Sequence, residues 1–207
     1  FMPWLAGTAL LHSAIVVEKR DALKSWTIFL SILAFSFSLL GTFLVRSGAL
    51  TSVHAFATDP TRGVFILFLL CLTVGGSLAL YAWRAPTLKG GGLFQPISRE
   101  GALVFNNVLL SIAAAMVLLG TLYPLLLETL TGEKISVGAP FFNSTFVPIM
   151  TPLIIAMAFG PMMPWKRADL FAVLGKLKIA IAAVILVLIV TYWLAGGPAF
   201  ALFGMGL

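Results

Sequence analysis

The sequence predicts an all-α fold, a polytopic bundle of about six transmembrane helices. Its 207 residues are 60% hydrophobic and 10% charged, with a mean hydropathy of +1.09, whereas soluble domains carry about 25% charged residues. The charges fall into five short clusters, and the stretches between them approach the ~20 apolar residues that a bilayer span needs. Residues 179–190 are apolar on every face, which is typical of a lipid-embedded helix and not of a barrel strand.

The charge clusters mark the ends of the predicted spans, which cover residues 1–17, 26–45, 64–83, 102–125, 146–165 and 179–197. Together these spans predict a single integral-membrane helical domain over 1–207. The chain opens on Phe1, without a start methionine, and closes on an apolar run. We therefore expect it to be an internal fragment of a longer protein.

The distribution of Lys and Arg predicts how the spans are oriented. Ten of the thirteen basic residues lie in the first, third and fifth clusters, and cytoplasmic loops carry the basic excess in membrane proteins. The loops at 46–63 and 126–145 are therefore predicted to face the outside. The same rule explains the net charge of +6 without a nucleic-acid partner.

Several local signals refine these spans. Asp59 followed by Pro60 predicts the N-cap and first helical position of the third span. Asn106 and Asn107 lie within the fourth span, where amides usually hydrogen-bond between helices. Cys71 is expected to be an inert apolar filler. Five tryptophans near span ends predict an aromatic belt at the membrane interfaces: Trp4, Trp26, Trp83, Trp165 and Trp193.

His12 stands out because no predicted span carries an Asp, Glu, Lys or Arg. It precedes Glu18 by six residues, which places it about 9 Å from the cytoplasmic end of its helix. An ionisable group at that depth is a functional hypothesis by default. Two interpretations stay open: a ligand to iron through one ring nitrogen, or a neutral histidine hydrogen-bonded to a neighbouring helix.

The second histidine, His54, lies in the predicted outer loop 46–63 among small and apolar residues. The absence of a nearby carboxylate makes this loop poor for zinc, which needs three or four ligands. It suits one axial ligand of a haem, whose remaining surface is an apolar macrocycle. Arg46 and Arg62 flank the loop and are candidate partners for haem propionates, or else anchors of the span ends to headgroups.

Several long segments of the chain resemble one family. The residues that carry the resemblance are FMPWL, GTALLHS, LGTFLVRSG, LGTLYP and KISVG, together with the stretch from Leu50 through His54 to Gly63. The chain is similar over essentially its whole length to a central piece of CcmF, the membrane subunit of the bacterial cytochrome c haem lyase.

The resemblance implies a role for each histidine. His12 corresponds to an axial ligand of a resident b-type haem, and its partner histidine would lie beyond Leu207. His54 corresponds to one of two periplasmic ligands of haem presented by the chaperone CcmE, the other lying before Phe1. No catalytic side chain is assigned.

The implied function is covalent attachment of haem to apocytochrome c at the periplasmic face of the bacterial inner membrane. The resident haem b would keep the incoming haem reduced with electrons from quinol, and a CcmH-type thiol oxidoreductase would be a further partner. Three alternatives stay open: a haem exporter of the same superfamily without a lyase role, a solute or ion transporter, and a purely structural subunit. The transporter is disfavoured because such carriers usually keep a charged residue within the membrane.

Overall fold

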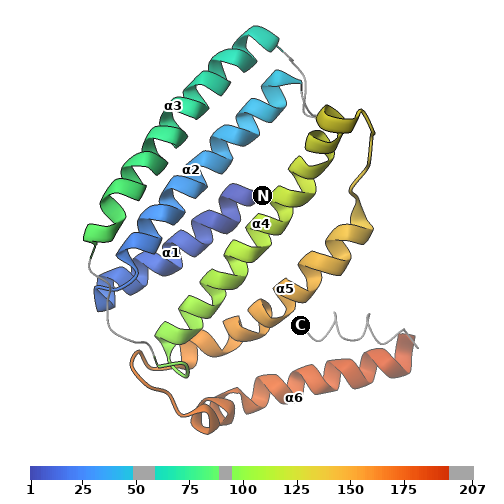
Figure 1. The fold of residues 1–207 in the computed structure, drawn as a ribbon. Coiled ribbons are helices and arrows are strands. Elements are labelled where there is room, and N and C mark those ends of the chain that lie inside the picture. Colours follow the sequence, from blue (N-terminus) through green and yellow to red (C-terminus); the bar gives the residue numbers. More distant parts are fainter. Residues whose placement is uncertain (49–58, 89–94, 196–207) are drawn as a thin grey trace. The chain divides into compact units, whose positions relative to one another are not determined.

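The computed structural model describes residues 1–48, 59–88 and 95–195 (Figure 1). Its elements are α1 (Met2–Arg20), α2 (Lys24–Ser47), α3 (Pro60–Arg84), α4 (Arg99–Thr131), α5 (Ala139–Phe159) and α6 (Leu170–Ala195), with two 3₁₀ turns, η1 (Ala85–Thr87) and η2 (Gly160–Met162). No strand occurs in the described residues. The all-α architecture that the sequence predicts is confirmed.

Five of these helical segments are long and apolar enough to cross a membrane, namely those that contain α2 to α6. Helix α1 is the shortest of the six, with 19 residues, and it ends on Glu18, Lys19 and Arg20. The six helices agree with the expectation of about six spans and make this a multi-pass membrane protein. That α1 itself crosses the bilayer stays a prediction.

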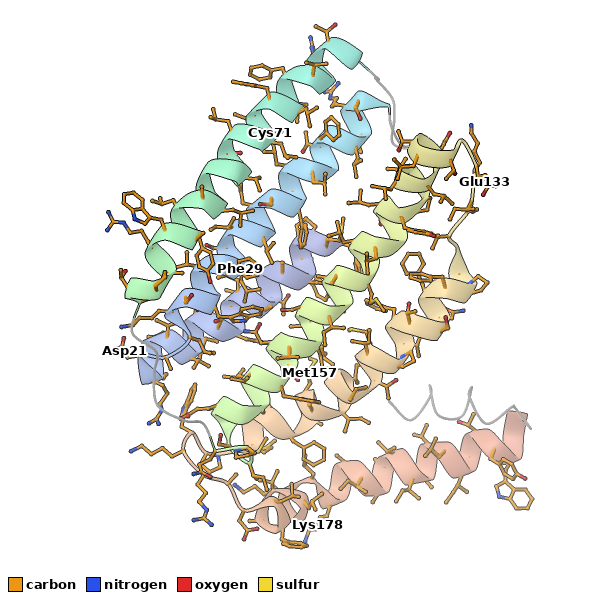
Figure 2. All side chains as sticks on the ribbon, in the orientation of Figure 1. Asp21, Phe29, Cys71, Glu133, Met157 and Lys178 are labelled. Carbon is orange, nitrogen blue, oxygen red and sulfur yellow. The ribbon has the colours of Figure 1, made fainter. Side chains whose placement is uncertain are left out.

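The described chain forms two compact units, of which the first holds residues 1–92 and 107–149. Within it α1 packs on α2, and α2 packs on α3. A three-residue turn reverses the chain between α1 and α2, with Asp21 in the left-handed conformation at a φ of 54°. Figure 2 shows Asp21 at this turn, where its carboxylate accepts a 2.7 Å hydrogen bond from the Lys24 ammonium.

Helix α1 buries one stripe of side chains at spacings of three and four residues: Met2, Leu5, Ala6, Ala9, Ser13 and Val16. Three of these six side chains are small. Small residues allow helix backbones to approach closely, which is the main route to tight packing when lipid is the solvent. The composition of the stripe therefore suits α1 for close contact with other helices of the protein.

The N-terminus of α3 is capped as predicted. The Asp59 carboxylate accepts hydrogen bonds from the backbone N–H groups of Thr61 (3.1 Å) and Arg62 (3.2 Å), and Pro60 occupies the first helical position. Farther along α3, Cys71 is exposed among the described residues (Figure 2). The structure thus confirms where this helix begins.

The second compact unit holds residues 93–106 and 150–207. In this unit Arg99, at the start of α4, contacts the segment that follows α5. Its guanidinium donates to the Pro161 carbonyl (3.1 Å) and lies 5.3 Å from the centroid of the Trp165 ring, while its backbone N–H donates to Pro164 (3.0 Å). These contacts give hydrogen-bond donors to two carbonyls at and beyond the end of the α5–η2 segment, where carbonyls lack intrahelical partners.

The helices are longer than the uncharged stretches that predicted them. The predicted outer loop at 126–145 is largely helical, because α4 continues to Thr131 and α5 begins at Ala139. Likewise α6 begins at Leu170, so that Lys178 lies inside the helix (Figure 2). A charged side chain does not end a helix, since its long stem can carry the charge to the interface. A residue such as Gly132, with a φ of +75°, does end one.

Candidate functional site

The predicted ligand His12 lies on α1 beside the buried stripe, immediately before the fully buried Ser13. Its side chain is half-buried. The Nδ1 atom is buried and has no hydrogen-bond partner among the described residues. A buried polar atom without a partner costs about 1–3 kcal/mol, which makes the Nδ1 atom of His12 a candidate contact for a further group.

Two interhelical hydrogen bonds hold α1 on either side of His12. Before it, the Asn107 amide nitrogen on α4 donates to the Ala9 carbonyl at 3.0 Å. After it, the hydroxyls of Ser13 and Thr27, on α1 and α2, lie 2.6 Å apart. The prediction that an amide in the fourth span bonds between helices is confirmed for Asn107.

Trp26, which its place near a span end predicts to lie in the aromatic belt, makes an interhelical hydrogen bond. Its indole N–H donates to the Asn107 side-chain oxygen at 2.9 Å, within the first compact unit. Its ring is also 5.6 Å from the Phe29 ring, measured between centroids. The sequence could not distinguish these roles, because position near a span end is the same for an anchor and for an interhelical donor.

The stems of the predicted outer loop are joined to each other. The Asp59 N–H donates to the Arg46 carbonyl at 3.1 Å, which ties the start of α3 to the end of α2. The contact is close: a Cβ added to Gly63 would lie 2.9 Å from the Ser47 Cα. Gly48 ends α2 in the left-handed conformation, at a φ of 74°. His54 itself lies outside the described residues.

The two arginines that flank this loop are brought to the same end of the α2–α3 pair. Arg62 forms an ion pair with Asp59 at 3.2 Å, and its side chain stays 72% exposed. A guanidinium carries five donors, so this pair leaves Arg62 with capacity for a second anion. The role of Arg46 and Arg62 as propionate partners stays a prediction.

The described residues offer one candidate axial ligand for a haem. No group of three or more His, Cys, Asp or Glu side chains that could hold a metal ion exists among residues 1–48, 59–88 and 95–195. Haem needs only one or two axial side chains because the macrocycle supplies the other ligands. His12, with its unpartnered Nδ1 in an apolar helix pair, meets that requirement.

The proteins that this chain resembles act in the biogenesis of cytochromes c, as their names say. The family described as Cytochrome C assembly protein matches residues 1–51, which include α1 and α2. The chain is 65% identical over its full length to the cytochrome c-type biogenesis protein CycK of Bradyrhizobium diazoefficiens and 46% identical to CcmF of Escherichia coli. This chain belongs to the CcmF/CycK family.

The CcmF/CycK assignment extends to the fold. A solved structure named Cytochrome c Heme Lyase CcmF matches all of this chain with a TM-score of 0.71 and 32% identity. The chain covers 29% of that structure, 31% of the Bradyrhizobium protein and 32% of the Escherichia protein. It thus spans about a third of the length of the CcmF/CycK relatives that it matches.

Proposed function

We propose that this chain is part of the membrane component of a cytochrome c haem lyase. The observation that carries the proposal is similarity over the whole chain to CycK and CcmF proteins, together with the matching structure named as a haem lyase. The placement of His12 supports it independently, because a half-buried imidazole with an unpartnered ring nitrogen suits an axial ligand. The membrane is the bacterial inner membrane, and the working face is periplasmic.

His12 holds a resident b-type haem in this proposal. A neutral imidazole binds iron through one ring nitrogen, and its other nitrogen carries a proton that needs an acceptor. Residues from outside this chain would complete the site. When bound, the haem would supply one-electron transfer, by which electrons from quinol would keep the incoming haem reduced.

His54 receives the haem that the chaperone CcmE delivers. The joined stems of its loop bring Arg46 and Arg62 to the same end of two helices, where their guanidinium groups pair with the propionates of the substrate haem. Apocytochrome c then adds two cysteine S–H groups across the haem vinyl groups to give thioethers. A CcmH-type subunit keeps those thiols reduced. The protein contributes binding and orientation to this reaction.

The test is to purify the full-length protein from a host that makes haem and to compare two single variants. His12→Ala is expected to remove the b-type absorbance while leaving the trapped haem–CcmE complex detectable. His54→Ala is expected to diminish that complex while leaving the b-type absorbance. Tyr81→Phe is a control, because it removes one interhelical hydrogen bond, to Ser25, which joins α2 to α3 and involves neither histidine.

The possible outcomes separate the two assignments. An unchanged spectrum in His12→Ala would refute the resident-haem role of His12. Exchange of the two phenotypes would show that the two histidine roles are reversed. If neither variant changed haem content or the complex, both histidines would be incidental and the haem-lyase proposal would lose its site.

A further inference from the structure

The position of His12 depends on how α1 is rotated about its axis. The two bonds that hold α1 are made by Ala9 and Ser13, which are four residues apart and therefore on one face of the helix. His12 lies between them in sequence. Successive residues are rotated by about 100° on a helix of 3.6 residues per turn, so any rotation of α1 that moves the imidazole also moves the groups of Ala9 and Ser13 that make the two bonds.

Asn107 is the residue through which three helices are joined at this point. It is 2% exposed. Its side-chain oxygen accepts from Trp26 on α2, and its amide nitrogen donates to Ala9 on α1. The indole N–H is a donor only and the carbonyl an acceptor only, so the two partners also fix which way the amide faces.

The burial of Asn107 and its partners makes these hydrogen bonds costly to break. Ala9 and Ser13 are both 0% exposed, and Asn107 is nearly so. A polar group at such a site either keeps its partner or is left buried without one, which is costly in a low-dielectric interior. Rotation of α1 away from Asn107 is therefore opposed by more than packing.

We propose that Asn107 is a positioning residue for the haem site at His12. It acts through the Ala9 carbonyl to hold α1 in the rotation that aims the imidazole, with Trp26 fixing Asn107 in turn. The proposal rests on the haem-binding role of His12. Groups that orient an axial or metal-binding histidine affect affinity by on the order of 10- to 100-fold when removed.

The experiment compares Asn107→Leu with Tyr81→Phe in the full-length protein. Leu keeps the branched shape and the number of side-chain heavy atoms of Asn107 but removes both of its side-chain hydrogen bonds. Tyr81→Phe removes an interhelical bond of similar length, 2.8 Å, between Ser25 and Tyr81, and this bond does not involve α1. Haem content per protein, the rate of haem loss to an apoprotein acceptor, and the midpoint potential of the haem that remains are measured for each.

The expected result is a rate of haem loss raised on the order of tenfold in Asn107→Leu, with a shifted midpoint potential in the retained haem. Tyr81→Phe should match the wild type in both. Equal behaviour of the two variants, with an unchanged potential per bound haem, would overturn the proposal. The potential matters because a merely destabilised protein loses haem without altering the haem that stays bound.

A second pair of variants keeps the proposal testable if Asn107→Leu does not fold. Trp26→Phe removes one of the two side-chain hydrogen bonds of Asn107, and Ser13→Ala removes the other interhelical bond of α1, to Thr27. Both should shift the potential. No shift in either would overturn the proposal. His12→Ala is measured alongside: if it too leaves the haem unchanged, the fault lies with the haem-binding role of His12 and not with Asn107 alone.

Discussion

Helices α1 and α6 are placed by different forces. Helix α1 buries six of its 19 residues, among them a serine, and is joined to α2 and α4 by side-chain hydrogen bonds. Helix α6 is longer, with 26 residues, and Val173 is the one residue of its described side chains that is buried. Hydrophobicity alone puts a helix such as α6 into lipid, but it leaves the rotation of the helix undetermined. A helix that must aim one side chain needs directional contacts, and α1 has them.

The largest expected effect is on the stripe of α1. Ala9 is 0% exposed, so Ala9→Leu would force three extra carbons against α2 and α4 and displace the carbonyl that Asn107 binds. Overpacking of this kind typically costs about 1–3 kcal/mol. The unfolding temperature of the full-length protein in detergent should fall by several degrees. Ala182→Leu in exposed α6 is the matched control and should leave it unchanged; equal losses would contradict the contrast between the two helices.

The next effect concerns the contact between α2 and α3. A Cβ on Gly63 would meet the Ser47 Cα at 2.9 Å, so Gly63→Ala should separate the stems of the His54 loop and weaken the Asp59–Arg46 bond. On the same helix, Gly75 has open space around its Cα. Gly75→Ala should be neutral or stabilising, by up to about 1 kcal/mol from helix propensity. Trapping of the haem–CcmE complex measures the difference, and reduced trapping by Gly75→Ala instead would refute it.

A smaller effect is expected at the cap of α3. Asp59→Ala removes the acceptor for two backbone N–H groups, which typically costs about 1 kcal/mol. Asp59→Asn keeps a cap but loses the charge that pairs with Arg62, so it should retain nearly all of the stability. The unfolding temperatures of the two variants are compared. If Asn were as damaging as Ala, the exposed ion pair and not the cap would be the stabilising contact.

The smallest effect is expected on the exposed face of α6. Ile185 is 51% exposed in the described chain, and Ile185→Leu exchanges one apolar surface for another. Its unfolding temperature should equal that of the wild type within error. A loss of stability as large as that of Ala9→Leu would mean that this face of α6 packs against a part of the full-length protein that this chain does not include.

The sequence predicted the features that are set locally and missed those that depend on partners. Asp59-Pro60 carries its own start signal, and the helix begins there. Asn107 could be predicted to bond between helices, because a buried amide in hydrocarbon has few alternatives. Its partners, Ala9 and Trp26, were not predictable, because each lies more than 80 residues away and the choice is made by packing.

The candidate site shows the same division. His12 could be found from the sequence because it is the one ionisable residue in a long uncharged stretch. That its Nδ1 atom has no hydrogen-bond partner could be seen only in the structure. The hydrogen bonds from Arg99 to the carbonyls of Pro161 and Pro164 could not be predicted, because no sequence pattern marks them. The ends of α4 and α5 were missed because the spans were measured between charges, whereas backbone conformation ends a helix.

The short turn at Asp21 bears on how the protein is made. Only three residues separate α1 from α2, and the Ser13–Thr27 bond lies between these two helices. We expect α1, with its histidine, to be retained in the bilayer as one arm of a helical hairpin whose other arm is the more apolar α2. Membrane insertion of α1 alone and of the α1–α2 pair can be compared in a cell-free translocation assay. Efficient insertion of α1 by itself would show that it needs no such companion.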